Sequence, residues 1–145
     1  IRIAKEEGIL PINISIDSIG VGAGVVDRLR EQGWNINAVN VAETARDSEH
    51  YLNKRAELYG AVKDWLKTGM LPKDDDFYEL ANVKYKFTSK GQLQLEAKED
   101  MKKRGLDSPD VADALALTFS DRGVVFIPPQ SKPREGYYSD ADISF

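Results

Sequence analysis

The sequence predicts one α/β domain built around a pair of parallel strands. Residues 9–16 and 34–41 are rich in β-branched residues and alternate apolar with polar residues over most of their length, as strands do. Residues 25–33 between them have helical spacing and end at Gly33. A strand, a helix and a strand of these lengths form a βαβ unit, whose strands are parallel. The length of 145 residues suits one domain with a hydrophobic core.

The composition excludes several classes of site. Cysteine is absent, so there are no disulfides or thiolate metal sites, and the single histidine, His50, argues against histidine-rich zinc sites and a Ser-His-Asp triad. Any bound metal must have oxygen ligands, which favours Mg²⁺ or Mn²⁺. With a net charge of -4, binding to nucleic acid would need a local basic patch. No apolar run approaches the roughly 20 residues that span a bilayer, so no membrane association is expected.

The first strand leads into a candidate catalytic acid. Residues 1–8 have the pattern of the last turns of a helix that ends at Gly8, so we expect the sequence to be part of a longer domain. The strand 9–16 begins near Pro11, and Asp17 lies at its carboxyl end, where open α/β sheets place their chemistry. A plain Asx turn would also explain Asp17. The glycine-rich residues 20–24 do not fit G-x-G-x-x-G, which makes a dinucleotide site a minor alternative.

The middle of the chain predicts a core helix and a basic hairpin. Residues 42–51 form a polar loop with His50 on the surface, and Asn53 caps a helix over 53–68 whose apolar stripe is core. The three aspartates at 74–76 are interpreted as a solvated cap before a short helix. Residues 82–96 alternate around a Lys90-Gly91 turn and predict a hairpin with one lysine-bearing face. The positive side chains of this region that we consider for DNA binding are Lys84, Lys86, Lys90, Lys102, Lys103 and Arg104.

The most informative segment is the apolar helix predicted within residues 106–121. Ser108 is its expected N-cap and Pro109 its first residue, while Asp110 and Asp113 share a face near its positive end. A carboxylate on a buried helix must be paired, hydrogen-bonded or bound to a metal. These residues alone leave both a structural role and a metal-binding role for Asp113 open. Residues 1–122 are assigned to the domain, and 123–145 to a C-terminal extension and mobile tail.

Three motifs in this order resemble the nuclease domain of the large terminase subunit of tailed bacteriophages. They are I-D-S-I-G-V-G-A-G-V-V-D-R-L at 16–29, N-K-R-A-E-L at 53–58, and L-E-A-K-E-D-M-K-K-R-G-L-D-S-P-D-V-A-D-A-L-A-L-T at 95–118. The resemblance implies an RNase H-like mixed sheet flanked by helices, with a β-hairpin insertion that borders the DNA. It also implies a metal-dependent endonuclease that cuts concatemeric double-stranded DNA by two-metal hydrolysis during genome packaging.

The resemblance assigns Asp17 and Asp113 as metal ligands and catalytic residues, with Asp110 assisting, and Mg²⁺ or Mn²⁺ as cofactor. The implied partners are double-stranded DNA, an ATPase domain of the same polypeptide, the small terminase subunit and the portal protein, in the cytoplasm of a bacterial host. The family's first acid lies on N-terminal strands that this sequence lacks. We therefore expect weak or absent cutting, provided that Asp17 and Asp113 share a pocket. The alternatives are another RNase H-like nuclease of the junction-resolvase type and an inactive DNA-binding or docking module.

Overall fold

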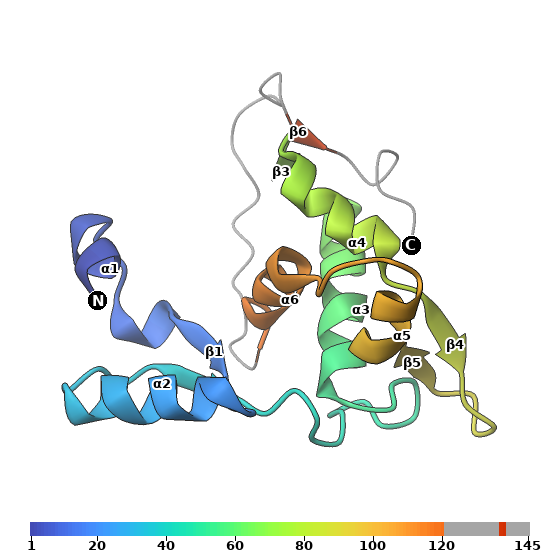
Figure 1. Cartoon of the computed structure of the whole chain (residues 1–145), viewed down its shortest axis with the longest axis horizontal. Coiled ribbons are helices and arrows are strands. Elements are labelled where there is room, and N and C mark those ends of the chain that lie inside the picture. The colour runs from blue at the N-terminus through green and yellow to red at the C-terminus, as the bar shows by residue number, and fades with distance from the viewer. Residues whose placement is uncertain (121–136, 139–145) are drawn as a thin grey trace.

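The structure, a computed structural model that describes residues 1–120 and 137–138, has the predicted α/β class (Figure 1). The helices are α1 (Arg2–Glu6), α2 (Val21–Glu31), α3 (Lys54–Leu66), α4 (Glu79–Asn82), α5 (Lys98–Lys103) and α6 (Asp110–Leu117). The strands are β1 (Ser15–Asp17), β2 (Asn37–Val39), β3 (Leu71–Pro72), β4 (Tyr85–Phe87), β5 (Leu93–Leu95) and β6 (Tyr137–Tyr138). Two 3-10 helices, η1 (Pro11–Asn13) and η2 (Asp75–Tyr78), complete the described elements.

The predicted βαβ unit is confirmed. Strands β1 and β2 pair in parallel, with Asp17 opposite Val39, and α2 connects them. Both strands are shorter than expected. Pro11 begins η1 instead of a strand, because its fixed φ suits the first position of a helical turn. Described strands form three separate pairs, β1–β2, β4–β5 and β3–β6, in place of one continuous mixed sheet.

The start of α2 is pressed against the end of β1. Gly20, with a φ of 60°, precedes the helix in a conformation that side chains other than glycine rarely adopt. A Cβ atom built on Gly22 would lie 1.8 Å from the carbonyl oxygen of Asp17. The glycine-rich segment therefore allows the close approach of α2 that fixes the position of Asp17.

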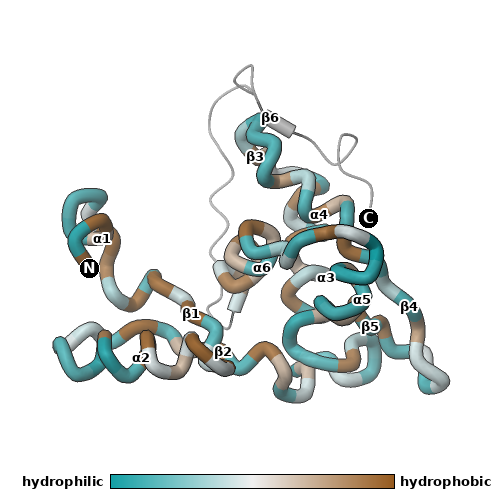
Figure 2. The backbone as a smooth tube through the Cα atoms, viewed as in Figure 1, coloured by the Kyte–Doolittle hydropathy of each residue, from teal (hydrophilic) through white to brown (hydrophobic). Residues whose placement is uncertain are grey.

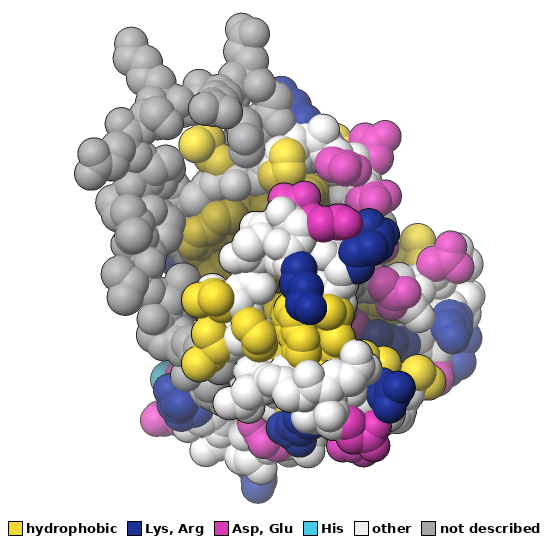
Figure 3. Space-filling view, turned by 90° about the vertical axis from the view of Figure 1, so that its left-hand side faces the viewer, with side chains coloured by type: hydrophobic (Ala, Val, Ile, Leu, Met, Phe, Trp, Pro, Cys, Tyr) yellow, Lys and Arg dark blue, Asp and Glu magenta, His cyan; other side chains and the backbone are white. Residues whose placement is uncertain are grey.

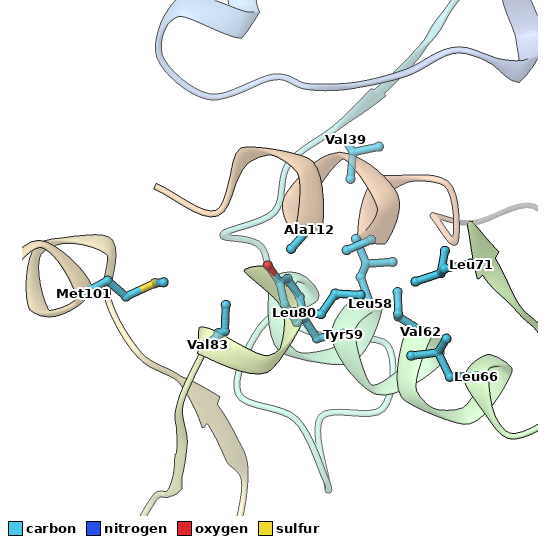
Figure 4. Close-up of a cluster of buried hydrophobic side chains, with 11 residues drawn as sticks. Val39, Leu58, Tyr59, Val62, Leu66, Leu71, Leu80, Val83, Met101 and Ala112 are labelled. Atoms are coloured by element: carbon cyan, nitrogen blue, oxygen red, sulfur yellow. The ribbon is translucent and has the colours of Figure 1, made fainter. Parts of the chain in front are cut away.

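The core lies between α3, α6 and α4 (Figure 4). Leu58, Tyr59 and Val62 on α3 pack towards Ala112 and Ala116 on α6, whose small side chains let the two helices approach closely. Val39 brings β2 into this cluster, and Leu71, Leu80, Val83 and Met101 close its other sides. Figure 2 shows that apolar residues are frequent along α6. The predicted apolar stripe of 53–68 is thus confirmed as core.

A small polar cluster ties the βαβ unit to α6. The Asn37 side chain donates to the hydroxyl oxygens of Ser15, at 3.1 Å, and of Ser120, at 2.8 Å. Ser120 follows α6 and is buried. These bonds join β1, β2 and the end of α6, so the strand that carries Asp17 and the helix that carries Asp113 are held together.

The remaining elements agree only in part with the sequence predictions. The hairpin is confirmed as β4 and β5, with Gly91 in the turn at a φ of 81°. Helix α5 is not among the elements predicted from the sequence. The predicted mobile tail contains β6, which pairs with β3, while the rest of the predicted extension from residue 123 onward lies outside the described residues.

The N-terminal segment contributes little to the core. Figure 3 shows apolar side chains exposed on the face at this end of the molecule. Exposed large apolar side chains of the first 25 residues are Ile1, Ile3, Ile9, Leu10, Ile12, Ile19, Val21 and Val25. The stable centre of the described structure is therefore the α3–α6 cluster and not the N-terminal end.

Replacing Gly22 by alanine should lower the free energy of unfolding by about 2–3 kcal/mol, because the new methyl group would overlap the Asp17 backbone. Gly24 lies in the same helix, and nothing comes within 4 Å of a Cβ atom there. Gly24→Ala should therefore leave the stability unchanged or raise it by up to about 1 kcal/mol. Urea unfolding of both variants measures this, and equal stabilities would contradict the close packing.

Candidate active site

The three acids predicted from the sequence line one pocket. This pocket has a volume of about 240 Å³ and lies where β1, α3, α5 and α6 meet. Its polar lining consists of Asp17, Asp110, Asp113, Arg55, Tyr59 and Lys98, and its apolar lining includes Val41, Leu58 and Leu117. Asp17 and Asp113, which are far apart in the sequence, thus face the same space.

Asp17 enters the pocket from the carboxyl end of β1. One of its carboxylate oxygens, Oδ1, accepts a hydrogen bond of 3.1 Å from the backbone N–H of Ile19. This is the Asx turn considered as the plain structural role of Asp17. The turn uses one oxygen only, and Asp17 forms no ion pair with the described part of the chain. The structural role and a ligand role are therefore compatible.

Helix α6 is capped differently from the prediction. Its N-cap residue is Pro109 instead of Ser108, and no side chain of the cap residue bonds to the helix. Glu79 of α4 supplies the missing acceptor, because its Oε2 atom accepts from the backbone N–H groups of Val111, at 2.7 Å, and Ala112, at 3.0 Å. A carboxylate at this position also interacts favourably with the helix dipole. The start of α6, and with it Asp110 and Asp113, is fixed by a residue distant in sequence.

Asp113 is held by three side chains. Its Oδ1 atom accepts hydrogen bonds from Arg55 Nε, at 3.0 Å, and from the Tyr59 hydroxyl, at 2.8 Å. Arg55 Nη2 also lies 2.9 Å from Oδ1, but it is not aligned for a hydrogen bond and has no such partner in the described structure. The other oxygen, Oδ2, forms an ion pair of 2.7 Å with Lys98 Nζ. Both oxygens of Asp113 are therefore engaged by cations.

These contacts set the charge state of the site. Burial alone would raise the pKa of the Asp113 carboxyl, but the charge of Arg55 and the hydrogen bonds from Lys98 and Tyr59 hold that pKa below its ordinary value. Burial and the nearby charge of Asp113 raise the pKa of the Tyr59 hydroxyl, which therefore stays protonated and donates. Asp113 is an ionised acceptor with its counter-charges already in place.

In this arrangement the acids do not form a preassembled metal centre. No group of three or more acidic or histidine side chains in residues 1–120 is arranged to hold a metal ion. Asp110 is exposed at the first turn of α6, and Asp113 is occupied by Arg55 and Lys98. The donor set is nevertheless suited to a hard divalent cation, because all of its available ligands are carboxylate oxygens.

Sequence reasoning missed the residues that hold Asp113. Arg55 and Tyr59 are four residues apart in a predicted helix, which places them on one face. This spacing is the feature of the sequence that could have identified the two side chains as neighbours. The sequence pattern places Tyr59 only in the core, and Lys98 only in a basic group. Pairing them with Asp113 requires knowledge of how α3, α5 and α6 pack.

The predicted DNA-binding residues divide into two sets. Lys84, Lys86 and Lys90 are exposed on the hairpin, and Lys102 is exposed on α5. Lys103 and Arg104 are instead ion-paired, with Asp100 and Glu96 respectively. Their charge is partly neutralised locally, so the hairpin lysines are the stronger candidates.

Two other sequence interpretations have a direct structural counterpart. Asp74 accepts from the backbone N–H of Asp76, at 3.1 Å, and so caps η2, while Asp75 and Asp76 are exposed. His50 is exposed and bonded to Asp47 of the same loop. Neither lines the acidic pocket.

An acid-lined pocket at the carboxyl end of a parallel strand lies where open α/β sheets place their chemistry. The structure is similar to the nuclease domain of the large terminase subunit gp2 of bacterial virus Sf6, at a TM-score of 0.62 and 26% identity, over 81% of this chain and 67% of that chain. A variant of that domain with one lysine replaced by alanine, solved with manganese, gives the same TM-score and identity over 68% of its length. The same variant with calcium gives a TM-score of 0.59 and 26% identity over 81% of this chain and 67% of that chain.

These similarities confirm the predicted resemblance to phage terminase nuclease domains, and they support a nuclease. No family model matches the sequence, and no curated protein does either. Among the described residues, no helix is long and apolar enough to cross a membrane.

The ion pairs of Asp113 predict a specific loss of stability in acid. The pKa of Asp113 is lower in the folded protein than in the unfolded chain. The carboxylate therefore makes its full contribution to the free energy of unfolding above the ordinary carboxyl pKa of about 4. This contribution disappears as the pH falls through the lower pKa of the folded state. Thermal unfolding between about pH 7 and about pH 3 should therefore be less pH-dependent in Asp113→Asn than in the unmodified protein. Asp110→Asn, at an exposed acid without an ion pair in the described structure, is the control. Parallel pH profiles for all three proteins would contradict the role of Asp113.

Proposed function

We propose that this chain is the metal-dependent endonuclease domain of a phage or prophage terminase large subunit. In this role it cuts concatemeric double-stranded DNA during genome packaging by two-metal phosphodiester hydrolysis. The observation that carries the proposal is the convergence of Asp17 and Asp113 on one pocket in a fold similar to terminase nuclease domains. A junction-resolvase type of nuclease would share this pocket, but none of the solved structures described above is of that type.

The carboxylates of Asp17 and Asp113 would hold the cation, with Asp110 assisting from the pocket rim. Mg²⁺ or Mn²⁺ suits these oxygen ligands, and the similar structures include domains solved with manganese and with calcium. A bound divalent cation supplies Lewis acidity and lowers the pKa of its water. Arg55 and Tyr59 hold Asp113 in a fixed orientation, and Leu58 and Leu117 form part of the apolar lining of the pocket.

We propose that cutting by this chain is weak. Two acids that approach the pocket from β1 and α6 are fewer ligands than a two-metal site needs. One of them must also exchange an ion pair for the metal. An inactive DNA-binding or docking module is the alternative, and the paired state of Asp113 is the observation that favours it.

DNA would approach along the hairpin. Lys84, Lys86 and Lys90 offer exposed positive charges at sequence positions close to α5, which carries Lys98 into the pocket. Such charges bind phosphates without reading sequence. The ATPase domain of the same polypeptide, the small terminase subunit and the portal protein are the partners that this role implies, in the cytoplasm of a bacterial host.

The acids can be tested directly by plasmid nicking with Mn²⁺. We expect slow nicking that stops with EDTA and falls to the EDTA background in Asp17→Asn and Asp113→Asn, whereas DNA affinity changes little. Asp64→Asn, which removes an exposed ion-pair partner of Lys67 away from the pocket, should nick normally. Nicking that survives both site variants would refute the assignment, and rapid nicking would refute the expected weakness.

The hairpin can be tested through the salt dependence of DNA binding. Replacing Lys84, Lys86 and Lys90 together by alanine should weaken DNA binding. The slope of the logarithm of the association constant against the logarithm of the salt concentration should become less steep by about 0.9 for each phosphate that the variant no longer neutralises. Lys67→Ala removes one exposed lysine elsewhere and should leave the slope unchanged. Fluorescence anisotropy with a short duplex measures both, and an unchanged slope in the triple variant would exclude the hairpin from the interface.

A further inference from the structure

A second cavity, which we call the hairpin groove, lies where the hairpin packs against α3 (Figure 1). Its volume is about 130 Å³, and its lining includes Tyr85, Phe87, Leu93 and Leu95 of the hairpin and Tyr59 and Lys63 of α3. Tyr59 lines the acidic pocket as well, and its hydroxyl donates to Asp113. The hairpin groove is therefore a direct neighbour of the acidic pocket.

Two aromatic rings of β4 form an exposed wall of the hairpin groove. Tyr85 is 46% exposed and Phe87 is 64% exposed, and their ring centroids lie 5.8 Å apart at an interplanar angle of 85°. Covering large apolar rings that are in contact with water is favourable, so they provide a binding surface. A flat aromatic ligand gains stacking energy on such rings in addition. The wall therefore favours an aromatic ligand over an aliphatic one.

The charges at the hairpin groove are positive. Lys63 is exposed, and none of the described residues that line the groove is acidic. Lys84 and Lys86 alternate with Tyr85 and Phe87 in the sequence and are also exposed. Lysines bind phosphates, and aromatic side chains stack on the faces of unpaired bases. An apolar peptide would cover the rings but would leave the lysines without a partner, so the combination favours a nucleotide.

We propose that the hairpin groove binds an unpaired nucleobase of single-stranded DNA, which stacks on Tyr85 and Phe87 while the adjoining phosphates contact Lys63 and the hairpin lysines. The bases of a duplex are stacked on one another and do not reach such a wall. The proposal goes beyond the proposed function, which needs only phosphate contacts to double-stranded DNA, and takes from it only that the nucleic acid is DNA. Because Tyr59 lines both cavities, the groove would hold a frayed or newly cut strand end beside the acids.

The test is a titration of a short oligothymidylate that carries one 2-aminopurine, in the presence of EDTA. Stacking quenches the fluorescence of 2-aminopurine, so we expect the unmodified protein to quench it. Tyr85→Leu and Phe87→Leu keep an apolar side chain but remove the ring, and each should abolish most of the quenching and weaken single-strand binding by about fivefold or more. A blunt duplex of the same length should bind to these variants and to the unmodified protein alike.

Tyr78→Leu is the matched control for the two ring variants. Tyr78 is 48% exposed, close to the exposure of Tyr85, but it does not line the hairpin groove. This variant should bind the oligonucleotide and quench 2-aminopurine as the unmodified protein does. Circular dichroism establishes that each variant is folded, and Phe87→Leu, at the more exposed ring, carries the test if Tyr85→Leu is not.

Three outcomes would overturn the base site. The first is the absence of quenching by the unmodified protein, or equal quenching by Tyr85→Leu, Phe87→Leu and Tyr78→Leu. The second is an equal loss of single-strand and duplex affinity in the ring variants, which would make the rings a general DNA contact. The third is self-association of the unmodified protein that Phe87→Leu abolishes, without quenching, which would assign the groove to a second copy of the chain. The measurement needs neither metal nor cutting, so its failure leaves the proposed nuclease standing, and a failure of nicking leaves the base site standing.

Discussion

The charge of Asp113 is the constraint on which the organisation of the site depends. A carboxylate on the inner side of a mostly apolar helix is costly unless other groups stabilise it. Helix α3 meets this demand with Arg55 and Tyr59, and α5 contributes Lys98. Arg55 also bonds to Glu96 after β5, so the same interaction connects the core to the hairpin. The position of Asp113 is thus a result of how three helices pack.

Asp17 reaches the same pocket through backbone constraints. Gly22 lets α2 approach the end of β1, and Asn37 links Ser15 to Ser120 at the end of α6. Glu79 fixes the other end of α6. These interactions bring two acids from distant parts of the sequence to one cavity, an arrangement that suits phosphodiester chemistry when cations are bound. In the structure both oxygens of Asp113 are engaged by Arg55, Tyr59 and Lys98.

Local patterns in the sequence predict much of this fold. Alternation and helical spacing identify the β1–α2–β2 unit, α3 and the hairpin, and one acidic residue in an apolar helix identifies Asp113. The interactions that these patterns miss involve residues far apart in the sequence. Glu79 caps a helix about 30 residues later, and Lys98 and Arg55 reach Asp113 from two other helices. Strand lengths are overestimated because Pro11 favours a helical turn over a strand and three-residue pairing suffices in β1.

The proposed metal site requires Asp17 and Asp113 to bind one divalent cation while Arg55 and Tyr59 stay bonded to Oδ1 of Asp113. Anomalous diffraction from crystals soaked in Mn²⁺ tests for this bound cation. We expect a manganese peak between Asp17 and Asp113, with Arg55 and Tyr59 still bonded to Oδ1 of Asp113. The absence of a peak in this pocket at saturating Mn²⁺ would refute the proposed metal site.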